Sequence, residues 1–457
     1  MSTLLTADAV VTVDAARTVI PDGAVLVDGD RIVAVGSTGR LTATYPGAEV
    51  TALPGRLLMP GLINAHSHSG LLRGTAESLP VWEWLRVHID PMHRVVSAAE
   101  AEAASWLCYA ESVLAGTTTV VDMWRHMHGS VVAATGVGNR LVTVNYTGAH
   151  PDFDYFDTLD DNEQLLQRSH GAANGRVSVW VGLEHVFYAD AAGRRRAIDM
   201  ARDYDTGFYT HCSESEIEIG EFDRRFGSRP MTALDRLGFF DVPRTMLAHA
   251  VWLDDSEIAL LAQRGVAVVH NPVSNMKLAS GVAPIERLLA AGVLVGLGTD
   301  GEKENNNLDM FEEMKTASLL AKLSCGDAAA LDSWKVIEMA TINGARGLGL
   351  DADIGSLEPG KKADLIAIRT DTPRMTPFFP EGPYFNLQHN LVHAVRGSDV
   401  DLTMIDGRVV VRDGQLISQD LPDIIARARA SVPGLFKRRS DWLAGHDDLE
   451  GVFGAHD

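Results

Sequence analysis

The sequence predicts an α/β protein: a (β/α)8 TIM-like barrel joined to a small β-sandwich domain built from both ends of the chain. Three observations lead to this prediction. Eight short β-type runs follow one another in the middle of the 457-residue chain, helical stretches separate most of them, and alternating apolar and polar residues occur at both ends. Strands that alternate with helices are typical of a parallel sheet closed into a barrel. The length allows one large domain and a smaller one.

Both ends of the chain have the pattern of β-hairpins. In "VLVDGDRIVAV" an Asp-Gly pair separates two alternating runs, and "DLTMIDGRVVVRDGQLI" near the other end repeats the pattern. Asp-Gly between such runs is a hairpin signal. We therefore expect residues 1–56 and 353–420 to form one composite β-sandwich domain. The catalytic barrel would then span residues 57–352, and residues 421–457 would form a helical tail.

The barrel prediction depends on eight β-type runs, at 57–66, 117–123, 140–146, 176–184, 207–212, 245–250, 266–271 and 293–300. Helical stretches lie at 98–116, 194–204, 255–265, 283–292 and 307–323. The alternative is a doubly wound open sheet. "GLGTDG", Gly296 to Gly301, favours that alternative because it matches the dinucleotide pattern G-x-G-x-x-G. However, it ends the last run instead of opening the first, and the carboxylate of Asp300 would repel a pyrophosphate.

Metal-competent side chains stand at the ends of five of these runs. In a barrel, functional groups lie at the carboxyl ends of the strands. One such residue alone indicates little, because a core histidine is common, but recurrence at one predicted face indicates a site. Three imidazoles and one carboxylate suit Zn²⁺, with Fe²⁺ or Mn²⁺ as alternatives. The residues are His66, His68, His211, His249, His270 and Asp300.

Glu214 in "HCSESE" adds a possible proton carrier. It lies three residues beyond His211, near enough to reach water at a metal without being a ligand. A divalent metal lowers the pKa of such water towards roughly 7, and a neighbouring carboxylate can move the proton to a leaving group. The alternative role for Glu214 is a carboxylate at a helix start.

Composition excludes several classes of partner. The formal net charge of −21 disfavours nucleic acid and anionic membranes. The N-terminal residues lack a signal-peptide pattern, and no apolar run approaches the ~20 residues that span a bilayer. Three cysteines far apart in the sequence fit a reducing compartment. We expect a cytoplasmic enzyme with a small-molecule substrate, no nucleic-acid or membrane partner, and a homo-oligomeric state, dimer or tetramer.

Several motifs together resemble one family. "PGLINAHSH", "HCSESE", "LAHAVWL", "VVHNPVSNMKLASGVAP" and "GTDGEKENNNLDMFEEMK" resemble the amidohydrolase superfamily, in particular its branch of S-adenosylhomocysteine/methylthioadenosine deaminases and s-triazine hydrolases. The resemblance covers nearly the whole chain. It implies one divalent metal per chain, held by His66, His68, His211 and Asp300. It also implies proton transfer by Glu214, contact of His249 with water or an oxyanion, and a general-base role for Asp300.

The number of metals follows from a departure in the fourth run. Binuclear relatives usually carry a carboxylated lysine there, and "RVSVWVGLEH" has no lysine. This absence favours a single metal. Glu184 remains an alternative bridge to a second metal.

The resemblance also bears on the substrate. His185 lies where nucleoside deaminases keep a histidine that hydrogen-bonds a heterocycle nitrogen, which favours deamination of a ring amine. We expect further substrate contacts from Trp82, Trp124 and His270. Glu302 and Glu304 follow Asp300 where relatives have small or neutral residues; they form either a solvated helix start or a site for an amidine-like cation.

His93 departs from the family pattern. In the nucleoside deaminases a glutamate at this position holds the ribose hydroxyls, and an imidazole cannot accept from both. We therefore predict hydrolytic deamination of a purine, pterin or triazine ring without ribose. Hydrolysis of an amide, urea, carbamate or halide-bearing ring, and S-adenosylhomocysteine/methylthioadenosine deamination, are the alternative activities. A catalytically silent barrel used as a binding scaffold is the non-enzymatic alternative.

Overall fold

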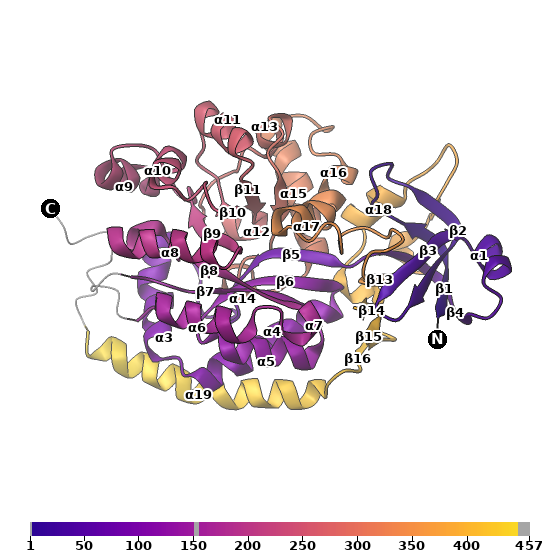
Figure 1. Ribbon diagram of the computed structural model, residues 1–457, viewed down its shortest axis with the longest axis horizontal. Coiled ribbons are helices and arrows are strands. Elements are labelled where there is room, and N and C mark those ends of the chain that lie inside the picture. Colours follow the sequence, from indigo (N-terminus) through magenta and orange to yellow (C-terminus); the bar gives the residue numbers. More distant parts are fainter. Residues whose placement is uncertain (1, 150–154, 447–457) are drawn as a thin grey trace.

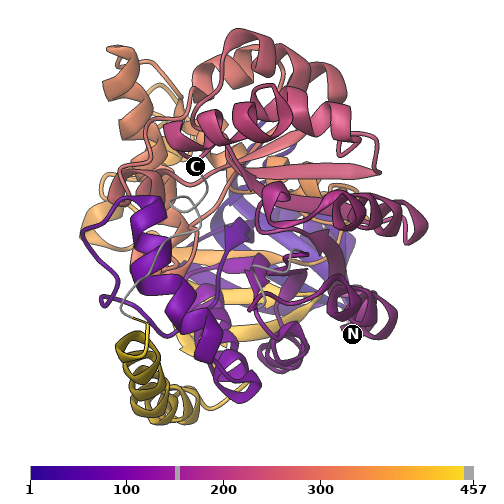
Figure 2. The same ribbon diagram turned by 90° about the vertical axis from the view of Figure 1, so that its left-hand side faces the viewer.

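A computed structural model of the chain describes residues 2–149 and 155–446. Its centre is a parallel eight-stranded sheet in the order β12-β11-β10-β9-β8-β7-β6-β5, which confirms the predicted barrel. Helices surround these strands when the molecule is viewed from its end (Figure 2). The strands are β5 (Leu62–Ser67), β6 (Thr117–Trp124), β7 (Arg140–Asn145), β8 (Val177–Gly182), β9 (Gly207–Cys212), β10 (Arg244–His249), β11 (Ala267–His270) and β12 (Val295–Leu297).

The helices of the barrel begin with standard capping signals. Ser97 and Glu100 form a capping box at α4, and Asp254 and Glu257 form another at α11. All five helical stretches expected from the sequence are present, as α4, α8, α11, α13 and α15. Among the described residues between β5 and residue 349, the α-helices are α2 (Val81–Trp84), α3 (Asp90–Val95), α4 (Ala98–Leu114), α5 (Met127–Val137), α6 (Leu159–Ser169), α7 (Ala172–Gly175), α8 (Ala191–Asp203), α9 (Glu216–Phe226), α10 (Pro230–Leu237), α11 (Asp255–Arg264), α12 (Pro272–Lys277), α13 (Ile285–Ala290), α14 (Glu302–Asn305), α15 (Met310–Cys325), α16 (Ser333–Met339) and α17 (Ile342–Leu348).

The last barrel strand meets the first where the functional residues lie. The backbone N–H of Asp300 donates to the carbonyl of His66 at 3.0 Å. Next to it, the N–H of Thr299 donates to Asn64 Oδ1 at 3.0 Å, and Asn64 Nδ2 donates to Thr299 Oγ1 at 2.7 Å. This nearly complete closure places Asp300 beside His66, although the two residues are far apart in the sequence.

A second sheet contains strands from both chain ends, in the order β16-β15-β14-β13-β4-β1-β2-β3. β4 and β13 pair antiparallel, with Leu365 opposite Pro60, so indigo and yellow segments lie together in Figure 1. The predicted Asp-Gly turns near the C-terminal end are present: Asp406 and Gly407 have positive φ, of 54° and 72°, and so do Asp413 and Gly414, of 52° and 69°. In the first hairpin Asp28 pairs with Arg31, so the turn consists of Gly29 and Asp30 instead of Asp28 and Gly29. The strands are β1 (Thr3–Val11), β2 (Val19–Asp28), β3 (Arg31–Ser37), β4 (Glu49–Pro60), β13 (Leu365–Arg369), β14 (Val400–Ile405), β15 (Arg408–Arg412) and β16 (Gln415–Leu416); α1 (Thr38–Thr44) follows β3 and α18 (Leu387–His393) follows β13.

The run at 57–66 corrects one expectation from the sequence. Residues 57–60 belong to β4 of the second sheet, and the barrel strand β5 begins only at Leu62. Gly61 joins the two strands where the backbone passes Thr118, because a Cβ at position 61 would lie 2.1 Å from Thr118 Cγ2. A continuous apolar run conceals such a change of sheet.

A buried ion-pair cluster joins the barrel to the second sheet. Arg140 at the start of β7 binds Asp364 through two hydrogen bonds, of 2.6 and 3.0 Å, and contacts Asp406 at 3.0 Å. All three side chains are at most 8% exposed. The guanidinium therefore ties the two sheets together.

The helix α19 (Leu421–Ala444) lies along the outside of the barrel, against α3 and α4 (Figure 1). Leu435 is buried there, and Arg438 donates to Glu100 at 2.5 Å. The last part of the expected helical tail, residues 447–457, lies outside the described residues.

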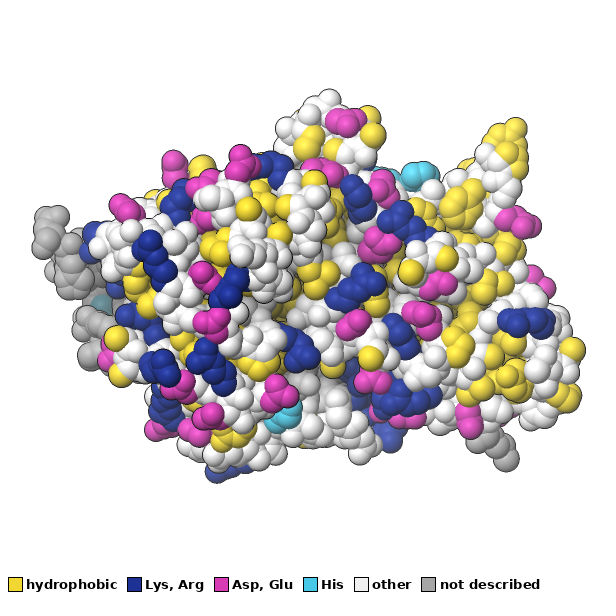
Figure 3. Space-filling model, turned by 45° about the horizontal axis from the view of Figure 1, so that its top comes forward, with side chains coloured by type: hydrophobic (Ala, Val, Ile, Leu, Met, Phe, Trp, Pro, Cys, Tyr) yellow, Lys and Arg dark blue, Asp and Glu magenta, His cyan; other side chains and the backbone are white. Residues whose placement is uncertain are grey.

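Among the helices of residues 2–149 and 155–446, none has the length and apolar content to cross a membrane. Acidic and basic side chains are interspersed over the face shown in Figure 3.

Candidate metal centre and active site

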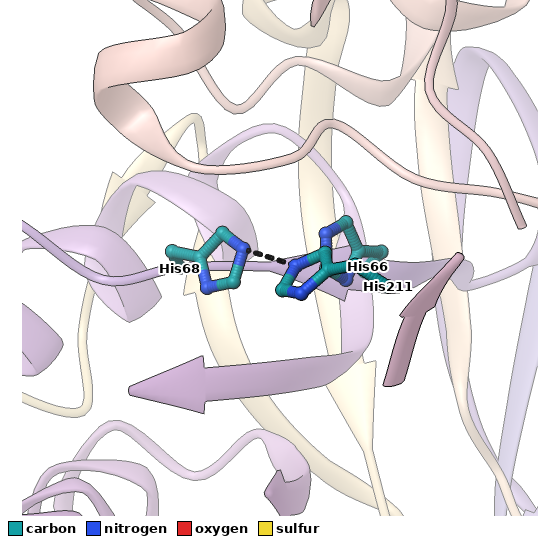
Figure 4. A group of neighbouring side chains, drawn as sticks. All are labelled: His66, His68 and His211. Carbon is teal, nitrogen blue, oxygen red and sulfur yellow. Dashed lines mark hydrogen bonds between the residues drawn. The ribbon is translucent and has the colours of Figure 1, made fainter. Parts of the chain in front are cut away.

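Three imidazoles converge at the carboxyl ends of β5 and β9. His68 Nδ1 lies 2.5 Å from the carbonyl oxygen of Met123, and His211 Nδ1 lies 2.8 Å from that of Glu184. A carbonyl only accepts, so each Nδ1 carries the proton and each Nε2 carries a lone pair. These two Nε2 atoms face one another at 3.1 Å, as Figure 4 shows with His66 beside them.

Two facing lone pairs repel unless a cation lies between them, so this arrangement fits a bound metal. Both ring nitrogens of His66 lack a hydrogen-bond partner among the described residues, although the side chain is fully buried. Asp300 Oδ1 lies 3.4 Å from Nε2 of His66 and from Nε2 of His68. Burial lowers the pKa of His66, His68 and His211, which favours the neutral, ligating imidazole. Three nitrogens and one carboxylate are a donor set that suits Zn²⁺.

Asp300 is held by its own hydrogen bonds. Ser274 Oγ donates to Oδ2 at 2.7 Å, and the backbone N–H of Gly301 donates to Oδ1 at 2.8 Å. Burial opposes ionisation, but the positive charge that a neighbouring histidine carries when it is protonated, that of His66 first, outweighs burial and holds the pKa of Asp300 well below its usual range. The φ of Asp300 is 59°, in the left-handed region that is costly for a residue other than glycine. This carboxylate is thus ionised and fixed in direction.

Glu214 and His249 lie on the other side of Asp300. His249 Nε2 is 3.7 Å from Glu214 Oε2 and 3.7 Å from Asp300 Oδ2. Asn275 Oδ1 accepts from His249 Nδ1 at 2.9 Å, so Nε2 points to the two carboxylates. Ser280 Oγ donates to Glu214 Oε1 at 2.9 Å. Burial, with the charge of Asp300, raises the pKa of Glu214 to about 7.

The segment after β11 orients these groups, a role that its motif did not indicate for its individual residues. One hydrogen bond joins Ser274 to Asp300, and a second joins Asn275 to His249. A third joins Ser280 to Glu214. The three residues of the segment are buried. The available signal was the group of Asn and Ser residues in "NPVSNMKLAS", directly after the seventh strand. Its residue types are common in turns, so only the structure shows which partner each one meets.

Two of the five expected substrate-contacting residues line the active-site cavity, two lie behind its lining, and one lies elsewhere. The cavity is lined by His68, Val81, Trp84, Leu85, Ile89, His93, Tyr146, Glu184, His185, His211, Glu214, His249, Leu278, Asp300, Lys303 and Glu304. His185 and His93 are therefore lining residues. Trp82 contacts His185 from outside, with ring centroids 5.3 Å apart, and Trp124 lies behind His93 at 5.2 Å. His270 lines a different cavity, beside α13 and α15.

Glu184 faces away from the three converging Nε2 atoms. Its Oε2 lies 2.7 Å from His185 Nδ1, and its Oε1 lies 3.5 Å from His211 Nδ1, the nitrogen on the opposite edge of that ring from Nε2. Burial lowers the pKa of His185, but Glu184 and two further carboxylates outweigh it and raise that pKa overall. In this position Glu184 orients two histidines.

Glu302 and Glu304 correct a second expectation, because neither is a solvated helix start. Glu302 is 1% exposed and Glu304 is 4% exposed. Lys303 between them is 2% exposed and lines the cavity with Glu304. Lys303 carries no sequence signal for a site, since a charge run at a helix start usually faces water.

The comparisons with known proteins agree with this geometry. A family model described as the amidohydrolase family matches residues 57–410, and one described as the imidazolonepropionase-like composite domain of bacteria matches residues 23–48. The 5-methylthioadenosine/S-adenosylhomocysteine deaminase of Desulforudis audaxviator is 37% identical over 423 residues, covering 91% of this chain and 95% of the relative.

Two solved structures share the whole architecture. An adenosine deaminase from Xanthomonas campestris with bound zinc has a TM-score of 0.89 and 31% identity, covering 95% of this chain and 98% of that chain. An atrazine chlorohydrolase from Arthrobacter aurescens complexed with zinc has a TM-score of 0.84 and 26% identity, covering 94% and 100%. Both relatives that the sequence resemblance named, the deaminases and the triazine hydrolases, are thus represented.

Proposed function

The chain belongs to the amidohydrolase family, and from this premise we propose that it removes an exocyclic amino group from a nitrogen heterocycle by hydrolysis, with release of ammonia. The observation that carries the proposal is the convergence of four metal-competent side chains on one buried point, with Glu214 and His249 beside it. The deaminase names of the relatives support the same reaction.

We assign the metal ligands to His66, His68, His211 and Asp300. A divalent metal bound there, which we propose to be Zn²⁺ with Fe²⁺ or Mn²⁺ as alternatives, would polarise the attacking water and lower its pKa to about 7. The hydrogen bonds that His68 and His211 donate to the carbonyls of Met123 and Glu184 orient the two imidazoles for this purpose. One metal per chain is expected, because Glu184 is turned towards the Nδ1 edges of its neighbours.

The proton transfers follow from the positions of three side chains. Asp300 takes a proton from water at a carboxylate oxygen as the water oxygen bonds to the ring carbon. The electron pair of the attacked C=N bond moves onto the ring nitrogen, and His249, held by Asn275, contacts the oxygen that has added to the carbon. Glu214 donates a proton to the departing amino nitrogen, and the C–N bond to it breaks as the electron pair returns from the ring nitrogen to the carbon. The proton taken by Asp300 then restores Glu214. The products are ammonia and the ring with a carbonyl in place of the amino group.

We propose a substrate without ribose. His93 lines the cavity, and neither of its ring nitrogens has a hydrogen-bond partner among the described residues. It therefore offers one acceptor at most to a cis-diol, which has two donors. His185 also lines the cavity, and its Nε2, which lies 4.0 Å from Glu218 Oε2, has no hydrogen-bond partner among the described residues; this supports a contact with a ring nitrogen.

The alternative reaction is displacement of a ring halide, and the similarity to the atrazine chlorohydrolase favours it over amide, urea or carbamate hydrolysis. Cytoplasmic location and a homodimeric or homotetrameric state are further parts of the proposal. Free Cys108, Cys212 and Cys325 are consistent with a reducing compartment.

The experiment is a panel of aminated purines, pterins and triazines, with chlorinated triazines included. Ammonia and chloride are measured together with the mass of the product. We expect one ammonia per product and a carbonyl-bearing ring. Chloride release without ammonia from any amine would replace the deaminase proposal by the dehalogenase alternative.

A further inference from the structure

A charged pair at the end of the active-site cavity has no role in the reaction described above. Lys303 Nζ lies 3.1 Å from Glu304 Oε1, and both side chains line the cavity. They are 2% and 4% exposed. A buried charge is costly unless its hydrogen-bonding capacity is used. The hydrogen-bond donors and acceptors that this pair leaves unused therefore indicate which groups a ligand in the cavity presents to it.

Each member of the pair has capacity left. The Lys303 ammonium has three donors; Glu304 takes one, and the face of Trp124 lies 5.5 Å from Nζ. Glu304 Oε2 is buried and has no hydrogen-bond partner among residues 2–149 and 155–446. The pair thus presents a donor and an acceptor side by side.

The pair lies next to the reacting centre. One carboxylate oxygen of Glu304 is within 4.8 Å of ligand atoms of His68 and of Asp300. A ring held for attack at the metal would have its neighbouring edge against Lys303 and Glu304. The chemistry of that edge can be stated from the two free groups.

We propose that Lys303 and Glu304 determine substrate specificity by recognising a lactam edge, a ring carbonyl adjacent to a ring N–H. This inference rests on the proposed deaminase function. The ammonium donates to the carbonyl oxygen and Glu304 Oε2 accepts from the N–H. The preferred substrates are amino-oxo heterocycles, as in isoguanine, guanine, cytosine and pterins.

A ribose diol matches this pair less well. A cis-diol presents two donors, whereas the pair offers one free acceptor, because Glu304 Oε1 is engaged by Lys303. The corresponding edge of adenine has a ring nitrogen that can accept from Lys303 but no ring N–H, so it leaves Glu304 Oε2 unpaired. A buried polar partner left unpaired is what excludes the wrong substrate most strongly.

Glu302 supplies a matched control. It is as buried as its neighbours, but its Oε1 accepts from the backbone N–H of Leu72 at 2.9 Å and it does not line the cavity. The change Glu302→Gln keeps that acceptor. A general effect of charge or folding in this segment would appear in this variant as well.

The experiment measures kcat/KM of the metal-loaded, full-length protein on pairs of rings that differ only in the lactam: isoguanine against adenine, and guanine against 2-aminopurine. We expect the oxo member to be preferred by a factor on the order of 10² or more. Lys303→Met and Glu304→Gln should each reduce this preference to about tenfold or less, mainly through KM of the oxo member. Glu302→Gln should retain it, and all variants should keep their metal.

Three results would overturn the proposal. They are equal kcat/KM for both members in the unchanged protein, an equal loss on both members in the variants, or loss of metal from Glu304→Gln, which would make Glu304 a ligand. Inhibition constants for 2-hydroxypurine and purine, which need no turnover, test the same edge. If no ring in the panel releases ammonia, the proposed function fails, and these constants still decide whether the pair recognises a lactam.

Discussion

The change Glu214→Gln should leave the metal in place and cut turnover severely. Glutamine keeps the size of the side chain, and its amide oxygen can still accept the hydrogen bond that Ser280 Oγ donates to Glu214 at 2.9 Å in the unchanged protein. The lost property is the proton that the carboxyl delivers. Removal of a positioned acid–base group costs on the order of 10² to 10⁴ in rate, or about 2.7–5.4 kcal/mol at 1.36 kcal/mol per tenfold.

The same role for Glu214 predicts the direction in which kcat changes with pH. Because burial raises the pKa of Glu214 to about 7, the carboxyl is protonated below that pH and loses its proton above it. If Glu214 is the proton donor, we expect kcat to fall as pH rises above about 7. We expect kcat of Glu214→Gln not to show this fall. The assay is ammonia release at saturating substrate with metal content measured on each sample. Glu216→Gln, at an exposed neighbouring position, is the control. Near-normal turnover in Glu214→Gln would refute the reasoning and leave Glu214 a structural carboxylate.

Three further predictions test other parts of the account. His211→Ala should lose the metal, seen by elemental analysis, while the folded content by circular dichroism is kept; full metal retention would remove His211 from the ligand set. Arg140→Ala should lower the free energy of unfolding, measured in urea, by about 3–5 kcal/mol, since it removes the cation that neutralises the buried Asp364 carboxylate. Arg195→Ala, at an exposed ion pair, should change it by about 1 kcal/mol or less, and equal effects would contradict this prediction. S-adenosylhomocysteine and methylthioadenosine should be poor substrates and His93→Glu should improve them; a kcat/KM of order 10⁴ M⁻¹s⁻¹ or more in the unchanged protein would exclude the ribose-free proposal.

The barrel could be predicted because its signals are local and repeated. The apolar residues of each β-type run indicate a buried strand at that place in the chain, and all eight runs correspond to strands. Polar residues at their carboxyl ends then fall on one face by topology alone. The positions of His66, His211 and Asp300 near one another follow from that rule, and the closure hydrogen bond between Asp300 and His66 is its outcome.

What could not be predicted depends on contacts between distant segments. The division of residues 57–66 between β4 and β5 depends on pairing with β13, some 300 residues away. The burial of Glu302 and Glu304 depends on partners in the first loop and in the cavity. The periodicity of apolar residues carries no information about such partners, so the expectation of a solvated helix start at Glu302 and Glu304 was wrong. His270 shows a similar limit, since a strand-end position does not by itself fix which cavity a side chain enters.

The most direct test of the central claim is reconstitution of the metal-free protein with Zn²⁺. The metal is removed by chelation, measured amounts are returned, and ammonia release from an aminated ring is recorded against metal bound. The account predicts no ammonia release without metal and a linear rise that saturates at one equivalent per chain. Ammonia release that is undiminished in the metal-free protein, or that rises only between one and two equivalents, would contradict it.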